Sequence, residues 1–586
     1  MLGTLLIGLL GLQSRFFMNS TTEVSPQWIE IGKPLPNQTF SFGLLLAQNN
    51  IDRLEKFVDE RSNPNSNYYG TWMTLKEIDT IVSTNIKDYN IVTDWLKNTI
   101  TNFHCIRTAD SLYCKTTIEM INTLFHTEML IYQNMITKKI IYSGRKSGYS
   151  IPTYLREIIE IVIGINDFPE YARKDMKAKF PEDNDYYITP LSLTELYNIK
   201  SEHSSQVIGS QSVVEFQNDE CFNLNDLNNF VKDNALNNIT ITKSHIIGEC
   251  DLETQDPDIE ASLDIQYQVG VNTNTNQEYV SVPDWLYQFA NLLYNMPNPP
   301  LVNSMSYGWA ERDQCDPDVF PVCYIGGDPE VYSKRTNIEF MKLSLRGITL
   351  LASSGDAGAA GRTNEGCTDD SPLNPVFPTS SPYVLSVGGT IIMNPVKATG
   401  TSPLCKENNC IGGGEELNCN FDRCGWTSGG GFSNFFNRPW WQENASNTYL
   451  GSKTLFPPTK YYNKMGRVYP DIALVSHNYL VNIGGSYMAV DGTSASSPAV
   501  SGMVSILNNL RLSQNKSSVG LVAPLLYDMY QKCPKCFKDI VEGSNNSTEA
   551  ADCEYGYHAA KGFDAVYGLG VPNFDEIYKY VKNMKN

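Results

Sequence analysis

The chain has 586 residues, of which 41% are hydrophobic and 19% charged, and its formal net charge is −19 at pH 7. This composition is typical of a globular protein with more than one domain and excludes a largely disordered chain. The negative charge argues against nucleic acid as a partner, because phosphate binding needs a basic face. It is compatible with an acidic compartment, where protonation of carboxylates reduces their mutual repulsion.

The first segment, Leu2–Leu12, is apolar and uncharged. It is too short to span a bilayer as a helix but has the length of a signal-peptide core. A buried terminal helix is the alternative, since no basic residue precedes the segment. We expect residues 1–18 to be a signal peptide. No other stretch is long enough to cross a membrane, so the mature protein should be soluble, either lysosomal or extracellular.

The chain contains 14 cysteines, which supports a route through the secretory pathway. Only Cys533-Pro-Lys-Cys536 has the spacing of half a zinc site, and neither a second such pair nor paired histidines accompany it. We therefore expect local disulfides among closely spaced cysteines. The close pairs are Cys105 and Cys114, Cys315 and Cys323, Cys405 and Cys410, Cys419 and Cys424, and Cys533 and Cys536.

Acceptor tripeptides for N-glycosylation also favour the secretory route, although such tripeptides arise by chance in an Asn-rich chain. They begin at Asn19, Asn37, Asn238, Asn444, Asn515, Asn545 and Asn546.

The region from Pro34 to Phe180 alternates strand-like and helix-like segments, which predicts a small α+β domain of ferredoxin-like proportions. No catalytic arrangement is evident in it. Thr74 and Glu77 have the spacing of a capping box at the start of a helix. The other expected elements are strands at Phe40–Leu46, Phe103–Ile106 and Leu112–Lys115, helices at Ile51–Glu60 and Val92–Thr101, and a loop at Asn63–Ser66.

Residues Arg173–Tyr187 mix basic, acidic and proline residues without apolar periodicity, which favours an exposed linker open to proteolysis. Ile188–Asn198 then opens a larger domain in which apolar strands alternate with helices. This pattern predicts a mainly parallel sheet covered by helices on both faces, with ligands beyond the carboxyl ends of the strands. The expected strands are Ser205–Gly209, Gly347–Ser353 and Tyr383–Gly389, and the expected helices include Trp285–Tyr294 and Val331–Leu345.

The segment Asp491–Ser501 has the pattern of a nucleophile turn that opens a helix. Gly492 permits a tight backbone, Ser494 supplies a hydroxyl, and Pro498 fits the first turn, where its missing N–H does no harm. The helix N-terminus provides backbone donors and a positive dipole end for an oxyanion. An ordinary capped helix is the alternative, because Thr-Ser-x-Ser is also common capping chemistry.

A catalytic serine needs a base, and the chain has only six histidines, none in a His-Gly-Thr setting. Glu260 and Asp264 offer another solution, since their spacing places both carboxylates on one helix face, a turn apart. Buried together they would share a proton, and at least one would titrate above its ordinary pKa. A glutamate base suits an acidic working pH. The alternative is a solvated acidic face, which this spacing favours when taken alone.

Asp356 follows an apolar strand in a Gly-flanked turn, so it lies at the ligand-binding edge of the predicted sheet. A protonated carboxyl there could donate a hydrogen bond to an oxyanion, although a strand-end aspartate is often only a turn former. Ser428–Ser433 is glycine-rich and could receive a peptide backbone as an added strand, or be purely structural. Near the C-terminus, Asp539-Ile540 and Ala560–Asp564 suggest a calcium site, because carboxylates and carbonyls are hard oxygen ligands.

Glu260-x-x-x-Asp264, Ser354-Gly-Asp356-x-Gly358 and Gly492-Thr-Ser494-Ala-Ser496 follow one another along the chain, after a segment Ser62–Gly70 and the Ile188-Thr-Pro sequence. Together they resemble the sedolisins, or serine-carboxyl peptidases, over nearly the whole chain.

The resemblance implies a subtilisin-like α/β peptidase domain at residues 187–586, after a removable prodomain at 19–186. Ser494 would be the nucleophile, Glu260 the general base and Asp264 its orienting partner, while Asp356 and the Ser494 amide would stabilise the oxyanion. The resemblance also implies a Cys105–Cys114 disulfide and one structural Ca²⁺ ion. Its ligands would be the side chains of Asp539 and Asp564 and the carbonyls of Ile540, Ala560 and Gly562.

We therefore predict an acid-active serine peptidase that hydrolyses peptides or proteins and is made as a self-processing zymogen, held inactive by its own prodomain. Tripeptide release from free N-termini is the favoured activity, and endopeptidase activity is the alternative. A histidine-based subtilisin relative and a catalytically inactive peptide-binding relative remain as further alternatives. The sequence leaves side-chain preference and oligomeric state open.

Overall fold

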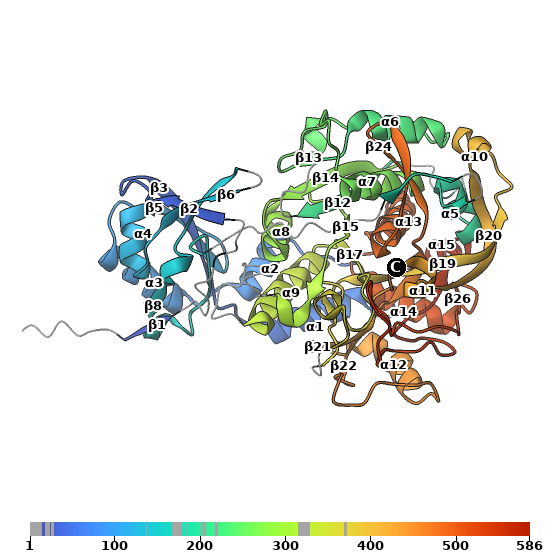
Figure 1. The fold of residues 1–586 in the computed structure, drawn as a ribbon. Coiled ribbons are helices and arrows are strands. Elements are labelled where there is room, and N and C mark those ends of the chain that lie inside the picture. Colours follow the sequence, from blue (N-terminus) through green and yellow to red (C-terminus); the bar gives the residue numbers. More distant parts are fainter. Residues whose placement is uncertain are drawn as a thin grey trace, which may run out of the picture. The chain divides into compact units, whose positions relative to one another are not determined.

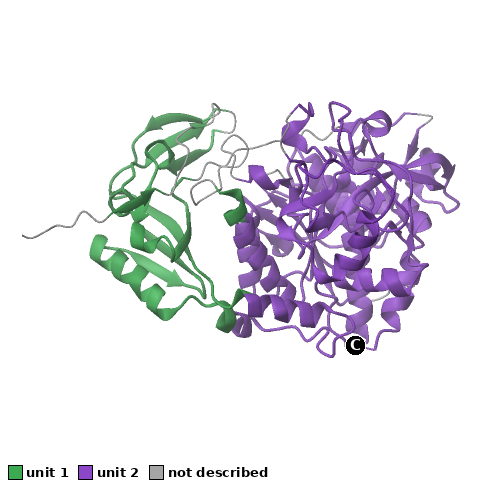
Figure 2. Ribbon diagram, turned by 90° about the horizontal axis from the view of Figure 1, so that it is seen from below, with its two compact units in different colours: residues 1–51, 79–170, 315–332 green, residues 52–78, 171–314, 333–586 purple. Residues whose placement is uncertain are grey.

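The computed structural model describes residues 14–17, 24, 28–135, 138–166, 178–182, 185–200, 203, 207–216, 221–314, 328–368 and 372–585. The chain divides into two compact units, coloured separately in Figure 2. Unit 1 comprises residues 1–51, 79–170 and 315–332, and unit 2 comprises residues 52–78, 171–314 and 333–586. Of the expected signal peptide, residues 1–13 and 18 lie outside the described residues, as do Asn19 and the close pair Cys315 and Cys323. Its residues Arg15–Phe17 form a strand, β1.

Unit 1 contains an antiparallel four-stranded sheet in the order β4 (His104–Arg107), β5 (Ser111–Thr117), β3 (Thr39–Leu46) and β9 (Ile159–Ile163). Helices α3 (Ile86–Thr99) and α4 (Ile118–Phe125) share one apolar core with the sheet. The smaller sheets join β2 (Trp28–Gly32), β6 (Leu130–Asn134) and β7 (Ile140–Ser143), and β1 (Arg15–Phe17) with β8 (Ser150–Pro152).

Side-chain caps set where two of the N-terminal helices begin. The Asn85 side chain accepts a hydrogen bond from Lys87 N, so α3 begins earlier than Val92, where apolar periodicity had placed it. The capping box at Thr74 and Glu77 is confirmed at the start of α2 (Leu75–Val82), because the Glu77 carboxylate accepts from Thr74 N at 2.8 Å.

Unit 2 contains a parallel sheet of seven strands, in the order β13, β14, β12, β15, β17, β19 and β23. The antiparallel strand β20 extends it beside β19, and β11 pairs with β20. The seven parallel strands are β13 (Ile246–Ile247), β14 (Asn276–Val282), β12 (Ser210–Phe216), β15 (Val302–Met305), β17 (Thr349–Ser353), β19 (Leu385–Lys397) and β23 (Ile472–Val475). The other two are β20 (Asn409–Asn418) and β11 (Tyr186–Tyr187).

Helices cover both faces of this sheet, as predicted. On β12, Val213 shares an apolar core with Ala261 and Ile265 of α7 (Ile259–Val271). Phe216 points to the opposite face, and its ring lies 5.1 Å from Trp285, at the start of α8 (Leu286–Asn295). Helix α13 (Thr493–Ser513) packs against α7 and crosses β15, β17 and β19 (Figure 1).

The remaining elements of unit 2 lie around this core. The helices are α1 (Ile51–Ser62), α5 (Pro190–Tyr197), α6 (Leu224–Asp233), α9 (Pro329–Leu345), α10 (Pro403–Glu407), α11 (Phe421–Cys424), α12 (Glu443–Leu450), α14 (Ala523–Lys532) and α15 (Phe574–Lys582). The short strands are β10 (Ala178–Lys179), β16 (Trp309–Ala310), β18 (Val376–Phe377), β21 (Gly431–Asn437), β22 (Gly466–Tyr469), β24 (Tyr479–Ile483), β25 (Ser486–Val490), β26 (Phe537–Lys538) and β27 (Val571–Pro572).

Two predicted elements differ from the structure. The strand expected at Ser205–Gly209 begins instead at Ser210. The sequence pattern missed this start because Gln211 and Ser212 are polar, although both are buried and have hydrogen-bond partners. The expected linker is partly ordered: β10 pairs with β25 and β11 pairs with β20, because unpaired edge strands accept additional strands. Residues 171–177 and 183–184 lie outside the described part of the chain.

Four of the predicted local disulfides are confirmed: Cys105–Cys114, Cys405–Cys410, Cys419–Cys424 and Cys533–Cys536. Two further disulfides, Cys221–Cys250 and Cys367–Cys553, join cysteines that the spacing had not paired. None of the helices in the described ranges combines the length and apolar character needed to cross a membrane.

The structure separates the glycosylation acceptors by exposure. Asn545 is buried, and its amide donates to Gly430 O and Ala565 O, so this side chain has no room for a glycan. Four acceptors are exposed: Asn37, Asn238, Asn444 and Asn515.

Candidate active site

Ser494 lies in the first turn of α13, at the edge of the sheet where the parallel strands end. The turn before it requires glycine, since Gly492 has a φ of 127° and a Cβ there would lie 3.0 Å from Asp356 Oδ2. The Ser494 side chain is buried, and its hydroxyl lies 3.5 Å from the carbonyl oxygen of Ser306. The sequence pattern therefore predicted both the helix start and the tight turn. Its placement of Pro498 in the first turn is wrong, because α13 begins at Thr493 and Pro498 lies inside the helix.

The acidic residues of α7 are buried inside unit 2. Asp258 caps the helix by accepting from Ala261 N at 3.0 Å. Glu260 is 5% exposed and Asp264 is fully buried. A solvated acidic face, which the spacing alone favoured, is therefore wrong: α7 packs directly against α13, and their contact removes these carboxyl groups from solvent.

Ser306 connects one of the α7 carboxylates, that of Asp264, to the nucleophile turn. Its hydroxyl lies 2.8 Å from Asp264 Oδ1 and 3.2 Å from the carbonyl oxygen of Ser494. It follows β15 directly, so the end of a central strand holds it between the two helices. Ser306 thereby brings Asp264 and Ser494 together around one hydroxyl group.

Asp356 reaches the same turn from the end of β17. Its Oδ1 accepts hydrogen bonds from Thr493 N at 2.8 Å and from Thr493 Oγ1 at 2.7 Å. The Thr493 hydroxyl also accepts from Gly355 N at 3.1 Å. The carboxyl of Asp356 is thus held beside the residue that precedes Ser494.

A third carboxyl group, Glu215 on β12, lies near the α7 pair and was missed by the sequence analysis. It is 1% exposed and accepts a 2.6 Å hydrogen bond from the Tyr307 hydroxyl. Burial raises its pKa well above the ordinary value, and the charges of Asp264 and Glu260 raise it further. A charged residue within the apolar run Val213–Phe216 was the available signal.

The glycine-rich segment Ser428–Gly430, just before β21, packs against the turn that carries Asp356. Gly429 N donates to Gly355 O at 2.7 Å, and a Cβ on Gly429 would lie 2.2 Å from Ser354 O. Thr427 pairs with Ala357 in an isolated bridge. The close backbone approach that the sequence suggested is therefore made to the Asp356 turn, which this segment supports.

The five expected calcium ligands converge near the C-terminus. Asp539 accepts from Gly562 N at 2.8 Å, and Asp564 accepts from Ala560 N, Val566 N and Tyr567 N. Burial raises the pKa of Asp564 to about 7, and the charge of Asp539 adds to the shift. Carboxylates close to backbone groups are suitable oxygen ligands for a hard divalent ion, and the charge of such an ion would balance theirs.

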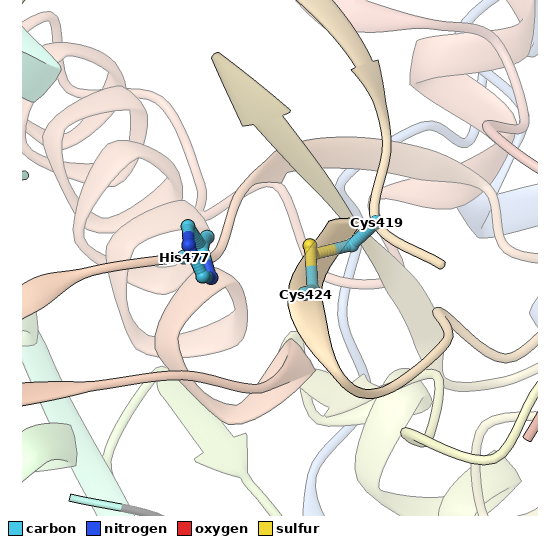
Figure 3. A group of neighbouring side chains, drawn as sticks. All are labelled: Cys419, Cys424 and His477. Atoms are coloured by element: carbon cyan, nitrogen blue, oxygen red, sulfur yellow. A yellow bond between two sulfur atoms is a disulfide. The ribbon is translucent and has the colours of Figure 1, made fainter. Parts of the chain in front are cut away.

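Another group of potential ligands, Cys419, Cys424 and His477, has side-chain atoms within 4.8 Å of one another (Figure 3). The two sulfur atoms are joined in a disulfide, so they are not available as thiolates, and calcium prefers oxygen in any case. His477 Nδ1 lies 2.9 Å from Asp491 Oδ1, and His203 Nε2 lies 3.2 Å from Asp575 Oδ1. His203 therefore pairs with a carboxylate of α15, whereas His477 lies beside Asp491, at the start of the Asp491–Ser501 segment that carries Ser494.

Comparison with known proteins agrees with this arrangement. Residues 26–168 match the family model "Pro-kumamolisin, activation domain". Physarolisin of Physarum polycephalum is 33% identical over 590 residues, covering 99% of each chain. Tripeptidyl-peptidase 1 of Dictyostelium discoideum is 31% identical, covering 92% of this chain and 88% of that protein. The human tripeptidyl-peptidase 1 is 30% identical, covering 95% and 94%.

Among solved structures, Pseudomonas sedolisin, a serine-carboxyl proteinase, matches 68% of this chain and 98% of its own with a TM-score of 0.50 and 21% identity. That likeness supports the subtilisin-like fold of the larger unit. With an activation domain, near full-length relatives and this fold, the chain belongs to the sedolisin family and is a serine-carboxyl peptidase made as a zymogen.

Proposed function

We propose that Ser494 is the nucleophile, Glu260 its general base and Asp264 the residue that orients the base. Asp356 and the Ser494 amide would stabilise the oxyanion. The observation that carries this assignment is the Ser306 hydroxyl, which lies within 3.2 Å of both the Asp264 carboxylate and the backbone of Ser494. The burial of Glu260 on the same helix as Asp264 supports it, because solvent does not compete for the side chain there.

In this mechanism the Ser494 oxygen attacks the scissile carbonyl while Glu260 takes the hydroxyl proton. Asp356 donates a hydrogen bond to the oxygen that gains negative charge. The tetrahedral intermediate collapses as Glu260 returns its proton to the leaving amine, which leaves an acyl-enzyme. A water molecule then repeats the sequence in reverse and frees Ser494.

The role of Asp356 accounts for acid activity. Its Oδ1 accepts two hydrogen bonds from Thr493, which hold the carboxyl group at the nucleophile turn with Oδ2 beside Gly492. Only the protonated form can donate a hydrogen bond to an oxyanion. Activity should therefore fall towards neutral pH as this proton is lost.

For the substrate, we propose release of tripeptides from free N-termini, which the printed names of the tripeptidyl-peptidase relatives support. Incubation of the enzyme at pH 4 with a long peptide should yield successive three-residue products, measured by mass spectrometry. The same peptide with an acetylated N-terminus should remain uncut. Internal fragments from both peptides would instead assign endopeptidase activity.

We also propose one structural calcium ion at Asp539 and Asp564, with carbonyl oxygens of Ile540, Ala560 and Gly562 as further ligands. Without a cation, the pKa of Asp564 is higher in the folded protein than in the unfolded chain. The protonated carboxyl group therefore stabilises the fold at a pH below the pKa of the unfolded chain, and this stabilisation is lost as the pH rises towards 7. Bound calcium would offset this loss by charge balance, and its effect should grow with pH.

Calcium removal should therefore lower the Tm at pH 7. Saturating calcium at 100 times its Kd would contribute about 2.7 kcal/mol. Asp539→Asn should abolish the calcium-dependent rise in Tm, whereas Asp552→Asn, an exposed aspartate outside the ligand set, should keep it. Calcium titration with differential scanning calorimetry makes the comparison, and equal responses of the two variants would disprove the site.

Glu215 gives a separate test of the carboxyl cluster. Its folded pKa is raised, so the protonated form is favoured in the folded state and stability is lost as pH rises above the unfolded value of about 4.3. Glu215→Gln removes the ionisation but keeps an oxygen acceptor for Tyr307. On an inactive Ser494→Ala background, its Tm should fall less than the parent's between pH 4 and pH 7. Parallel Tm curves would contradict the raised pKa.

We propose that residues 1–18 direct the chain into the secretory pathway, which ends in the lysosome or outside the cell. The six disulfides of the described residues support an oxidising route. We place the boundary between the activation domain and the peptidase domain near residue 186, where self-cleavage would release the mature enzyme.

A further inference from the structure

One stretch of the activation domain belongs to the compact unit of the peptidase. The family model for the activation domain covers residues 26–168, yet residues 52–78 group with unit 2, shown in one colour in Figure 2. This stretch contains α1, the following loop and the start of α2. It therefore differs from the rest of the activation domain in what it packs against.

Trp72 occupies a slot in the peptidase part of unit 2. A Cβ on Gly347 would lie 2.3 Å from Trp72 Cδ1, and one on Gly520 would lie 2.4 Å from Trp72 Cη2. Both positions also have positive φ values, 79° and 63°. Glycine is therefore favoured at each of them both by the backbone conformation and by the lack of space for a Cβ. The indole N–H donates to Ser518 O at 3.2 Å, which fixes the ring within the slot.

The residues around Trp72 add specific contacts. Tyr69 is 4% exposed, and the Arg511 guanidinium lies 5.1 Å from the centre of its ring. Met73 N donates to Leu345 O at 2.7 Å. Asn65 donates to Asp528 Oδ1 at 2.8 Å and accepts from Lys532 Nζ at 2.6 Å. Aromatic side chains in closely fitted pockets are the usual source of strong binding at interfaces.

This surface is remote from the active site. Helix α13 has 21 residues and is about 30 Å long, with Ser494 in its first turn and Arg511 in its last. Gly347 precedes β17, whereas Asp356 follows it, so the slot lies at the opposite end of the strand from the catalytic turn. Occupation of the slot cannot itself block Ser494.

We propose that residues 62–73 are an anchor by which the activation domain binds the peptidase domain at a separate docking surface, without need of the covalent connection. The docking surface consists of Gly347, Arg511, Ser518, Gly520, Asp528 and Lys532. Its ligand is the activation domain of this chain, recognised by the buried Tyr69 and the partly buried Trp72. The cut activation domain therefore stays attached through this surface. The proposal rests on the proposed division into activation and peptidase domains, but not on the catalytic assignment.

The test uses the full-length Ser494→Ala zymogen, with the recognition site of an added sequence-specific protease placed within residues 171–177. After cutting, the two fragments of the parent should elute together at neutral pH. Surface plasmon resonance then gives the dissociation rate. Tyr69→Ala and Trp72→Ala should each raise this rate by about tenfold or more. Tyr68→Ala is the matched control, since its side chain is 57% exposed and should change the rate less than about twofold.

Circular dichroism and the Tm of each uncut variant establish folding, and the exposed Asn65→Ala gives a milder variant expected to act in the same direction. Separation of the parent fragments on cutting would overturn the proposal. So would wild-type dissociation rates for Tyr69→Ala, Trp72→Ala and Asn65→Ala, because other contacts would then hold the fragments together. Residual peptidase activity of Ser494→Ala would contradict the catalytic assignment and leave the binding result unaffected.

Discussion

Ser494→Ala is expected to reduce kcat by about 10⁶-fold and to leave the zymogen uncut at acid pH. The loss follows because the hydroxyl is the attacking atom, and no other group in the proposed mechanism forms the acyl-enzyme. The change should cost far less in stability than in kcat, because alanine is a good helix former and the substitution removes a single hydroxyl group from α13. Peptide hydrolysis at pH 4, electrophoresis of the incubated zymogen and the Tm give the three readouts.

Ser513→Ala is the control for this change. Ser513 lies in the last turn of the same helix and donates to Leu510 O at 2.7 Å, so the variant should retain wild-type kcat and self-processing. Self-processing of the purified Ser494→Ala protein, free of any active enzyme, would refute self-cleavage. Processing only after addition of a trace of wild-type enzyme would show instead that one molecule cuts another.

Glu260→Gln is expected to reduce kcat by about 10²- to 10⁴-fold with little change in KM. Glutamine has nearly the same shape as glutamate but cannot take the proton of the Ser494 hydroxyl. The substrate should still bind, because the substitution keeps the volume of a buried side chain on α7. Steady-state kinetics between pH 3 and pH 6 measure both constants.

Glu278→Gln makes the same substitution at another partly buried carboxyl group, whose pKa is raised by burial to about 7. It lies on β14, outside the proposed catalytic set, and should leave kcat unchanged. Equal losses in the two variants would mean that kcat responds to buried charge in general. Near wild-type kcat for Glu260→Gln would remove the glutamate base from the mechanism.

Features that depend on near neighbours in the chain were predictable from the sequence. The Thr74–Glu77 capping box, the tight turn at Gly492 and the disulfides of closely spaced cysteines all form between residues a few positions apart. Alternation of apolar strands and helices likewise predicted the parallel sheet and the α+β domain. The helix that carries Ser494 could therefore be placed before any contact was known.

Features that depend on distant partners were not predictable in the same way. The spacing of Glu260 and Asp264 favoured a solvated face, but α13 covers them with residues more than 200 positions further along the chain. Glu215 was missed because its significance lies in Tyr307 and the α7 carboxylates, which come from other elements. The Ser205–Gly209 strand was misplaced because buried polar residues in β12 are satisfied across the sheet.

By itself, then, the sequence determined the chemical groups and their local geometry: a serine at a helix start, two carboxyls one turn apart, and a strand-end aspartate. Only the tertiary structure decided which of these groups are desolvated and which meet, as at Ser306. The physical reason is that backbone conformation follows from short-range sterics and hydrogen bonds. Burial, pKa and the slot that holds Trp72 depend on elements brought together from across the whole chain.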